Sequence, residues 1–109
     1  MGSGYSTPGG EVTPVYRLRY DREFWRQLER LPGDIRNLAR QKIRALADQP
    51  RPAQAKELDE HPGYFRLWLP RDYRLIWQVS DEERIVDLFY VGQKLPDLYE
   101  RLGLGRKRE

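Results

Sequence analysis

Apolar and polar residues follow regular patterns in the first half of the chain. In "VYRLRY" (residues 15–20) they alternate, which is typical of a half-buried strand. In "REFWRQLERL" (residues 22–31) and "IRNLARQKIRALADQ" (residues 35–49), apolar residues recur every three or four positions, as on one face of a helix. The short "PGD" break between these two segments predicts an antiparallel helical hairpin. The prolines that follow the second segment end its helix.

The second half contains three strand-like segments and a short helix-like one. "YFRLWL" (residues 64–69) and "YRLIWQV" (residues 73–79) each alternate, so we expect one face of each strand to be buried. "IVDLFYVG" (residues 85–92) is apolar on both faces, which predicts a strand that is central or covered. A last apolar stripe predicts a C-terminal helix and consists of Leu95, Leu98 and Leu102.

This order of elements predicts an α+β domain. We expect a small twisted, mostly antiparallel sheet that begins with the N-terminal strand and ends in a three-strand meander, with the helical hairpin packed on one face. The domain is expected to cover residues 15–104. Residues 1–14, rich in Gly, Pro, Ser and Thr, predict a flexible arm or a remnant of expression, and residues 105–109 predict a basic tail.

The composition excludes several classes of function. The 109 residues are enough for one compact domain. The absence of cysteine excludes disulfides, thiol catalysis and cysteine-ligated zinc. No apolar run approaches the roughly 20 residues of a membrane-spanning helix, so we expect a cytoplasmic protein with no membrane partner. The 20 basic against 17 acidic residues favour an anionic partner only slightly.

Two arginines are predicted on the sheet face that points away from the helices. Arg66 and Arg74 share this face with Tyr64, Trp68, Ile76 and Gln78. Side chains on neighbouring antiparallel strands lie about 5 Å apart when opposite and about 7–8 Å apart on the diagonal. Two guanidinium groups that close repel each other unless an anion lies between them, or unless each pairs with an acid such as Asp72 or Asp87. The residues alone favour neither interpretation.

The segments "AKEL", "YFRLWL", "DYRLIWQV" and "VDLFYVGQK", followed by Leu-Tyr, form a pattern that resembles the RelE/ParE superfamily of bacterial toxins, specifically its RelE branch. The resemblance covers about residues 15–102. It implies a small twisted sheet with helices on one face and a concave basic face on the other. It also implies a toxin of a type II toxin–antitoxin pair that cleaves messenger RNA in the ribosomal A site and is blocked by a cognate antitoxin.

The resemblance also implies the site residues. The candidate catalytic residues are Arg66, Arg74, Lys94 and Tyr99, and the candidate substrate-binding residues are Tyr64, Trp68 and Arg71. Arg74 would bind the scissile phosphate, and Arg66 would neutralise the same developing charge. Lys94 would bind phosphate or help protonate the leaving oxygen, unless it is simply solvated. Tyr99 would stack on a base or orient the 2′-hydroxyl, unless it only packs beside the leucine stripe.

Two positions depart from the family pattern. Trp68 stands where family members often carry a second basic residue, and Arg66 stands where some carry a lysine that is a candidate general base. Free arginine stays protonated to a pH of about 12, so it is a poor base near neutrality. Catalysis would therefore depend on positioning and charge stabilisation, with no metal or cofactor. The single histidine, His61, lies in a predicted "HPG" turn and is interpreted as a turn residue.

Three functions remain open from the sequence. The first is the ribosome-dependent endoribonuclease, with the antitoxin, the ribosome and messenger RNA as partners. The second is a DNA gyrase inhibitor of the ParE type, which the missing second basic residue at Trp68 supports. The third is a degenerate toxin that only binds an antitoxin, through apolar grooves around the helical hairpin.

Overall fold

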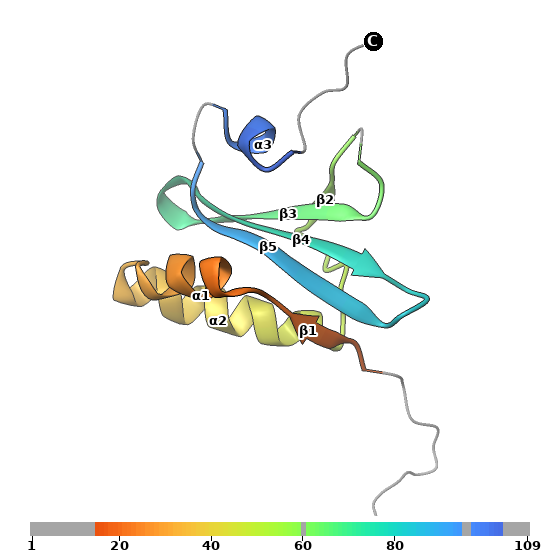
Figure 1. Ribbon diagram of the computed structural model, residues 1–109. Coiled ribbons are helices and arrows are strands. Elements are labelled where there is room, and N and C mark those ends of the chain that lie inside the picture. The colour runs from red at the N-terminus through yellow and green to blue at the C-terminus, as the bar shows by residue number, and fades with distance from the viewer. Residues whose placement is uncertain (1–14, 60, 95–96, 104–109) are drawn as a thin grey trace, which may run out of the picture.

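The computed structural model describes residues 15–59, 61–94 and 97–103, which form one mixed five-stranded sheet with helices on both sides (Figure 1). The elements are β1 (Arg17–Arg19), α1 (Arg22–Glu29), α2 (Gly33–Leu46), β2 (Lys56–Glu57), β3 (Tyr64–Leu69), the 3₁₀ turn η1 (Pro70–Asp72), β4 (Tyr73–Ser80), β5 (Ile85–Gln93) and α3 (Leu98–Arg101). The strand order is β1-β5-β4-β3-β2, with β1 parallel to β5 and the other pairs antiparallel. The predicted α+β class and the mostly antiparallel sheet are confirmed. The predicted arm and basic tail, together with Leu95, lie outside the described residues.

The two long helices form the predicted hairpin, with shifted ends. The Asp21 side chain caps α1 by accepting a hydrogen bond of 2.9 Å from the Phe24 amide. Helix α2 begins at Gly33, two residues before the predicted start. Pro32, in an extended conformation, is its N-cap, and the helix can begin directly after it because the first amides of a helix have no hydrogen-bond partner within the helix. It ends at Leu46 rather than at residue 49, where the amides of Ala47 and Asp48 donate to carbonyls three residues back and so tighten the last turn.

The main core lies between this hairpin and one face of the sheet (Figure 1). Its helical side is formed by Phe24, Leu28, Leu31, Ile35, Ala39, Ile43 and Leu46, and its strand side by Phe65, Leu67, Leu69, Leu75, Trp77, Val79, Val86, Leu88 and Val91. Trp77 is fully buried, and its indole N–H donates to the Pro50 carbonyl at 3.0 Å. Each large apolar side chain buried here stabilises the fold by about 1.5–3 kcal/mol.

A register shift places apolar residues of β5 on both faces of the sheet. Tyr90 is opposite Ile76, whereas Leu88 is opposite Trp77, so Phe89 is the extra residue of a bulge. Leu88 therefore faces the helical hairpin, whereas Phe89 and Tyr90 join a smaller cluster on the other face. The prediction that this strand is central or covered is confirmed.

Helix α3 covers part of that second face and is the predicted C-terminal helix. Leu98 is buried there against Ile76, with Tyr99 and Leu102 packed around it. Figure 1 shows α3 on the side of the sheet opposite α1 and α2. The second face thus has a small apolar cluster of its own, which holds Tyr99 close to the strands.

Two features of the connections are corrections to the predicted three-strand meander. A fourth strand, β2, pairs with β3 and forms the edge of the sheet. Its two residues are too few to show a periodic pattern, so the sequence did not indicate it.

The second correction concerns the turn between β3 and β4, where Arg71 and Asp72 both have left-handed backbone conformations, with φ of 59° and 68°. This turn aims Arg71 at α2, where its guanidinium donates to both carboxylate oxygens of Asp34 at 2.9 Å.

Candidate anion-binding cleft

An open cleft of about 370 Å³ lies on the second face of the sheet. Its lining residues are Lys56, Glu57, Leu58, Asp59, Arg66, Trp68, Arg74, Lys94 and Tyr99. The structure therefore brings together all four candidate catalytic residues and one of the three substrate-binding candidates, Trp68. They come from β2, β3, β4, the end of β5 and α3, so their proximity depends on the whole fold.

Strand pairing arranges the cationic side chains of this cleft. Lys56 is directly opposite Arg66 across β2 and β3, and Trp68 is directly opposite Arg74 across β3 and β4. Opposite residues have Cβ atoms about 4.5–5.5 Å apart. Lys94 follows β5, and its amide donates to the Asp72 carbonyl at 2.9 Å. Four neighbouring strands therefore each bring one cation to the cleft.

Arg74 is the most unusual of these residues because its charge is buried with no anionic partner in the described part of the chain. The residue is only 6% exposed. One terminal N–H donates to the Tyr99 hydroxyl at 3.1 Å, while the Nε atom has no hydrogen-bond partner. Its Cζ atom lies 4.2 Å from the centroid of the Trp68 ring. Burying a charge costs several kcal/mol unless an opposite charge or hydrogen bonds compensate it.

No carboxylate of the described residues forms an ion pair with Arg66 or Arg74. Of the two acids considered from the sequence, Asp87 instead accepts two hydrogen bonds of 2.7 Å from Arg19. This bond to Asp87 raises the pKa of the Arg19 guanidinium above its ordinary value. Within the part of the chain that the structure describes, neither cleft arginine therefore pairs with an acid.

Tyr64 and Arg71 do not line the cleft. The Tyr64 ring packs edge-on against Phe89, with ring centroids 5.2 Å apart, and contacts His61 on another side. Arg71 is engaged by Asp34 of α2. Their roles as substrate-binding residues stay predictions, and the structure gives each of them a packing or ion-pairing role.

Sequence reasoning missed Lys56, Glu57 and Asp59 as members of the site. The signal was present in "AKEL", which carried the family resemblance but was given no role in the chemistry. Glu57 accepts a hydrogen bond of 2.8 Å from the Gly63 amide, which ties the end of the β2–β3 loop to β2. With these residues the cleft holds four cationic side chains and two carboxylates, so its net charge is positive.

The strand end that carries Lys94 is fixed by a close contact. The Tyr90 hydroxyl donates to the Gln93 carbonyl at 2.8 Å. A Cβ atom added at Gly92 would lie only 2.7 Å from that hydroxyl, so any larger residue there would have to displace the Tyr90 ring. Gly92 is also directly opposite Arg74 across β4 and β5.

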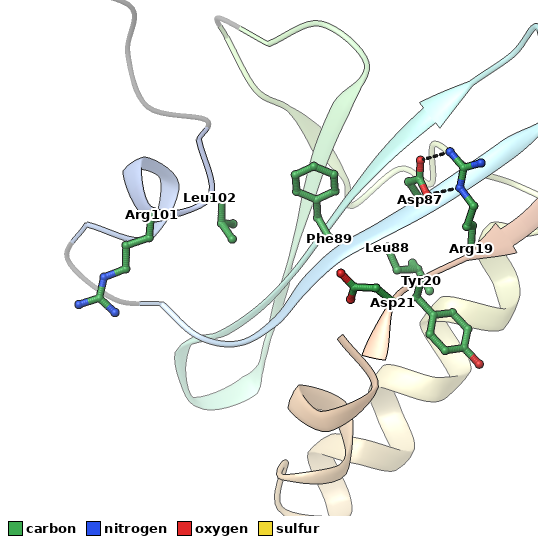
Figure 2. A pocket seen from close by; sticks show the side chains of 8 residues that line it. All are labelled: Arg19, Tyr20, Asp21, Asp87, Leu88, Phe89, Arg101 and Leu102. Carbon is green, nitrogen blue, oxygen red and sulfur yellow. Dashed lines mark hydrogen bonds and ion pairs between the residues drawn. The ribbon is translucent and has the colours of Figure 1, made fainter. Parts of the chain in front are cut away.

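A larger hollow of about 580 Å³ lies elsewhere on the molecule, between β1, β5 and α3 (Figure 2). Figure 2 shows Phe89 between Leu102 on one side and the Arg19–Asp87 pair on the other. None of the predicted site residues lines it, and its arginines are neutralised: Arg19 by Asp87, and Arg101 by Asp97 at 2.9 Å. It therefore offers less to an anionic ligand than the cleft around Arg74.

Within the described residues, no cluster of three or more His, Cys, Asp or Glu side chains could hold a metal ion. No helix in the same part of the chain is both long and apolar enough to cross a membrane.

Comparison with known proteins identifies the fold. No family model matches the sequence, and no curated protein matches it. Among solved structures, a doubly substituted variant of the E. coli toxin RelE in the free state is 24% identical, with a TM-score of 0.69 over 82% of this chain and 95% of that one. The intact E. coli RelBE toxin–antitoxin complex is 27% identical, with a TM-score of 0.65 over 74% of this chain and 99% of that one. A YoeB/ParE toxin from Agrobacterium tumefaciens is 16% identical, with a TM-score of 0.61 over 72% of this chain and 99% of that one. The resemblance seen in the sequence is thus confirmed in three dimensions: the chain has the fold of RelE toxins and of the RelE/ParE superfamily.

Proposed function

We propose that this protein is the toxin of a type II toxin–antitoxin pair and an endoribonuclease that cleaves messenger RNA in the ribosomal A site. The observation that carries the proposal is the buried Arg74 guanidinium, which has no carboxylate partner among the described residues and an unpaired Nε donor. A phosphate group would supply the missing acceptors, because the planar fork of arginine matches two phosphate oxygens. Arg66 and Lys94 line the same cleft and would share the neutralisation of that charge.

The proposed reaction uses the 2′-hydroxyl of the RNA. That oxygen attacks the adjacent phosphorus, the bond to the 5′-oxygen breaks, and a 2′,3′-cyclic phosphate and a free 5′-hydroxyl result. Negative charge grows on the phosphorane oxygens, where pre-positioned cationic donors stabilise the transition state most. Arg74 is well suited to this role because Trp68 and Tyr99 already hold its guanidinium, so little reorganisation is needed.

The reaction also has to move two protons. The attacking hydroxyl loses one, and the leaving 5′-oxygen gains one. Arg66 is a poor proton acceptor, whereas the carboxylates of Glu57 and Asp59 line the same cleft and are our candidates for accepting the first proton. Lys94 is a cationic donor on the β5 side of the cleft and is our candidate for protonating the leaving oxygen. The ribosome would complete the positioning of the strand.

An antitoxin is the proposed protein partner. Solved structures similar to this chain include E. coli RelE in complex with a peptide of the antitoxin RelB, and RelE–RelB complexes from other organisms. By analogy, we propose that a cognate antitoxin binds this chain in the cytoplasm and blocks it. Expression of the chain alone should then arrest growth, and co-expression of the antitoxin should relieve the arrest.

The decisive test is primer extension on a defined message in a cell-free translation system, with and without ribosomes. We expect cuts at A-site codons that require ribosomes, and we expect Arg74→Ala to reduce cleavage by at least about a hundredfold. Arg26→Ala is the matched control, since Arg26 is an exposed arginine of α1, on the opposite side of the sheet. A folded wild-type protein that makes no cuts would contradict the proposal and would direct the next assay to inhibition of DNA gyrase supercoiling.

A further inference from the structure

The exposed ring of Trp68 lies next to the proposed phosphate site. Trp68 is 61% exposed, more than any other large hydrophobic side chain in the described part of the chain. Single exposed apolar residues are common on protein surfaces and need no explanation by themselves. This ring, however, lines the cleft, so its apolar surface is presented to whatever ligand the cleft binds.

Two cations are held against the same ring. The Cζ atom of Arg74 lies 4.2 Å from the ring centroid, and that of Arg66 lies 5.5 Å from it. Both distances fall within the range of cation–π attraction. An arginine that stacks through the face of its guanidinium keeps the N–H groups at the edge free for an anion. Trp68 therefore holds Arg74 without competing for the donors that a phosphate would need.

We infer that Trp68 is a stacking platform for an unpaired nucleobase adjacent to the phosphate that Arg74 binds. The inference rests on the proposed function, since it gives the substrate of the same cleft a second point of contact. An aromatic face binds any base, because every base has a π-face, and single-stranded RNA leaves its bases free to stack. Trp68 stands where the family resemblance implies a second basic residue, so this chain exchanges one contact to the RNA backbone for a contact to a base.

The exchange has a measurable consequence. A phosphate contact does not depend on whether the nucleotide carries its base, whereas a stacking contact does. Loss of one base–aromatic stack corresponds to a loss of about ten- to a hundredfold in binding. Cleavage by this protein should therefore depend on the presence of a base at one nucleotide of the A-site codon.

The test combines variants of the protein with an abasic ribonucleotide in the message. Ribosomes with an empty A site are programmed with messages that lack the base at each A-site position in turn, and single-turnover cleavage is measured. We expect Trp68→Ala to slow cleavage of the normal message about ten- to a hundredfold, and Trp68→Phe to retain most activity. At one position, removal of the base should slow the wild type by a similar factor but should slow Trp68→Ala little further.

Two results would overturn the inference. Trp68→Ala could cleave as fast as the wild type. Alternatively, the penalties of Trp68→Ala and of base removal could multiply at every position, in which case the ring acts only by holding Arg74. Trp25→Ala, which removes an exposed tryptophan of α1 outside the cleft, is the matched control and should leave cleavage unchanged.

A second measurement separates this inference from the proposed function. In a Trp25→Phe variant, Trp68 is the exposed tryptophan, while Trp77 is fully buried. Titration with a single-stranded 2′-O-methyl oligonucleotide should quench its fluorescence to saturation, and an abasic oligonucleotide of the same length should not. Base-dependent quenching without any cleavage would leave the platform standing and contradict the ribonuclease. Cleavage without base-dependent quenching would contradict the platform alone.

Discussion

At the scale of single residues, Arg74 combines a cost to the fold with a function. Its guanidinium is buried, no carboxylate in residues 15–59, 61–94 and 97–103 pairs with it, and its Nε donor has no acceptor there. Removing an uncompensated buried charge often leaves stability unchanged or raises it. A site residue that destabilises its own fold is typical of positions kept for activity. We therefore do not expect Arg74→Ala to lower the melting temperature, although it should remove the cleavage activity.

Arg74→Lys tests whether the shape of the cation matters as well as its charge. Lysine keeps the charge but loses the planar fork, the stacked contact with Trp68 and the bond to Tyr99. We expect single-turnover cleavage to fall by about ten- to a hundredfold, with unchanged thermal unfolding. If the Arg74→Lys variant cleaves as fast as the wild type, a point charge is sufficient, and the argument for bidentate phosphate binding is contradicted.

At the scale of elements, the end of β5 connects packing to the site. Gly92→Ala would place a Cβ atom 2.7 Å from the Tyr90 hydroxyl, so the ring must move and its bond to Gln93 must weaken. We expect a loss of about 1–3 kcal/mol in the free energy of unfolding, as for other overpacked sites. Because this segment leads into Lys94 and lies opposite Arg74, cleavage should fall as well.

Circular dichroism melting measures that loss, and Gly33→Ala is its control. A Cβ atom at Gly33 meets nothing within 4 Å, and the residue lies in the first turn of α2. Alanine there should leave the melting temperature unchanged or slightly raised. If Gly92→Ala melts like the wild type, the Tyr90 contact does not constrain the strand end.

The elements also show what the sequence could and could not predict. The patterns of apolar residues predicted the helical hairpin and four of the five strands, because each of those segments is long enough for a pattern to show. Strand β2 has two residues and became visible only through its pairing with β3, which is why Lys56 was missed. Arg71 was a candidate substrate-binding residue, but two left-handed residues, Arg71 itself and Asp72, turn it toward α2. Backbone turns of this kind leave no mark in the alternation of side chains.

At the scale of the whole molecule, exposed ion pairs join segments that are far apart in the sequence. Asp34 of α2 binds Arg71 of the η1 turn. Asp81, in the β4–β5 turn, binds Arg51 of the α2–β2 loop and accepts a hydrogen bond from the Tyr16 hydroxyl. The hydrogen bond from Arg71 lowers the pKa of Asp34 below its ordinary value, and the bonds from Arg51 and Tyr16 lower the pKa of Asp81. These pairs therefore make the stability of the fold depend on pH.

The sign of that dependence follows from the direction of the two shifts. A carboxylate with a lower pKa in the folded state contributes stability above its unfolded pKa, about 3.9 for aspartate, and loses that contribution as the pH falls through its folded pKa. We expect the midpoint of urea unfolding to decline as the pH falls below about 4, and less steeply in an Asp34→Asn, Asp81→Asn double variant. Asp48→Asn removes an exposed carboxylate that forms no ion pair within the described residues, and it should follow the wild-type curve. Parallel curves for the double variant and the wild type would mean that both pairs are too well solvated to hold these segments together.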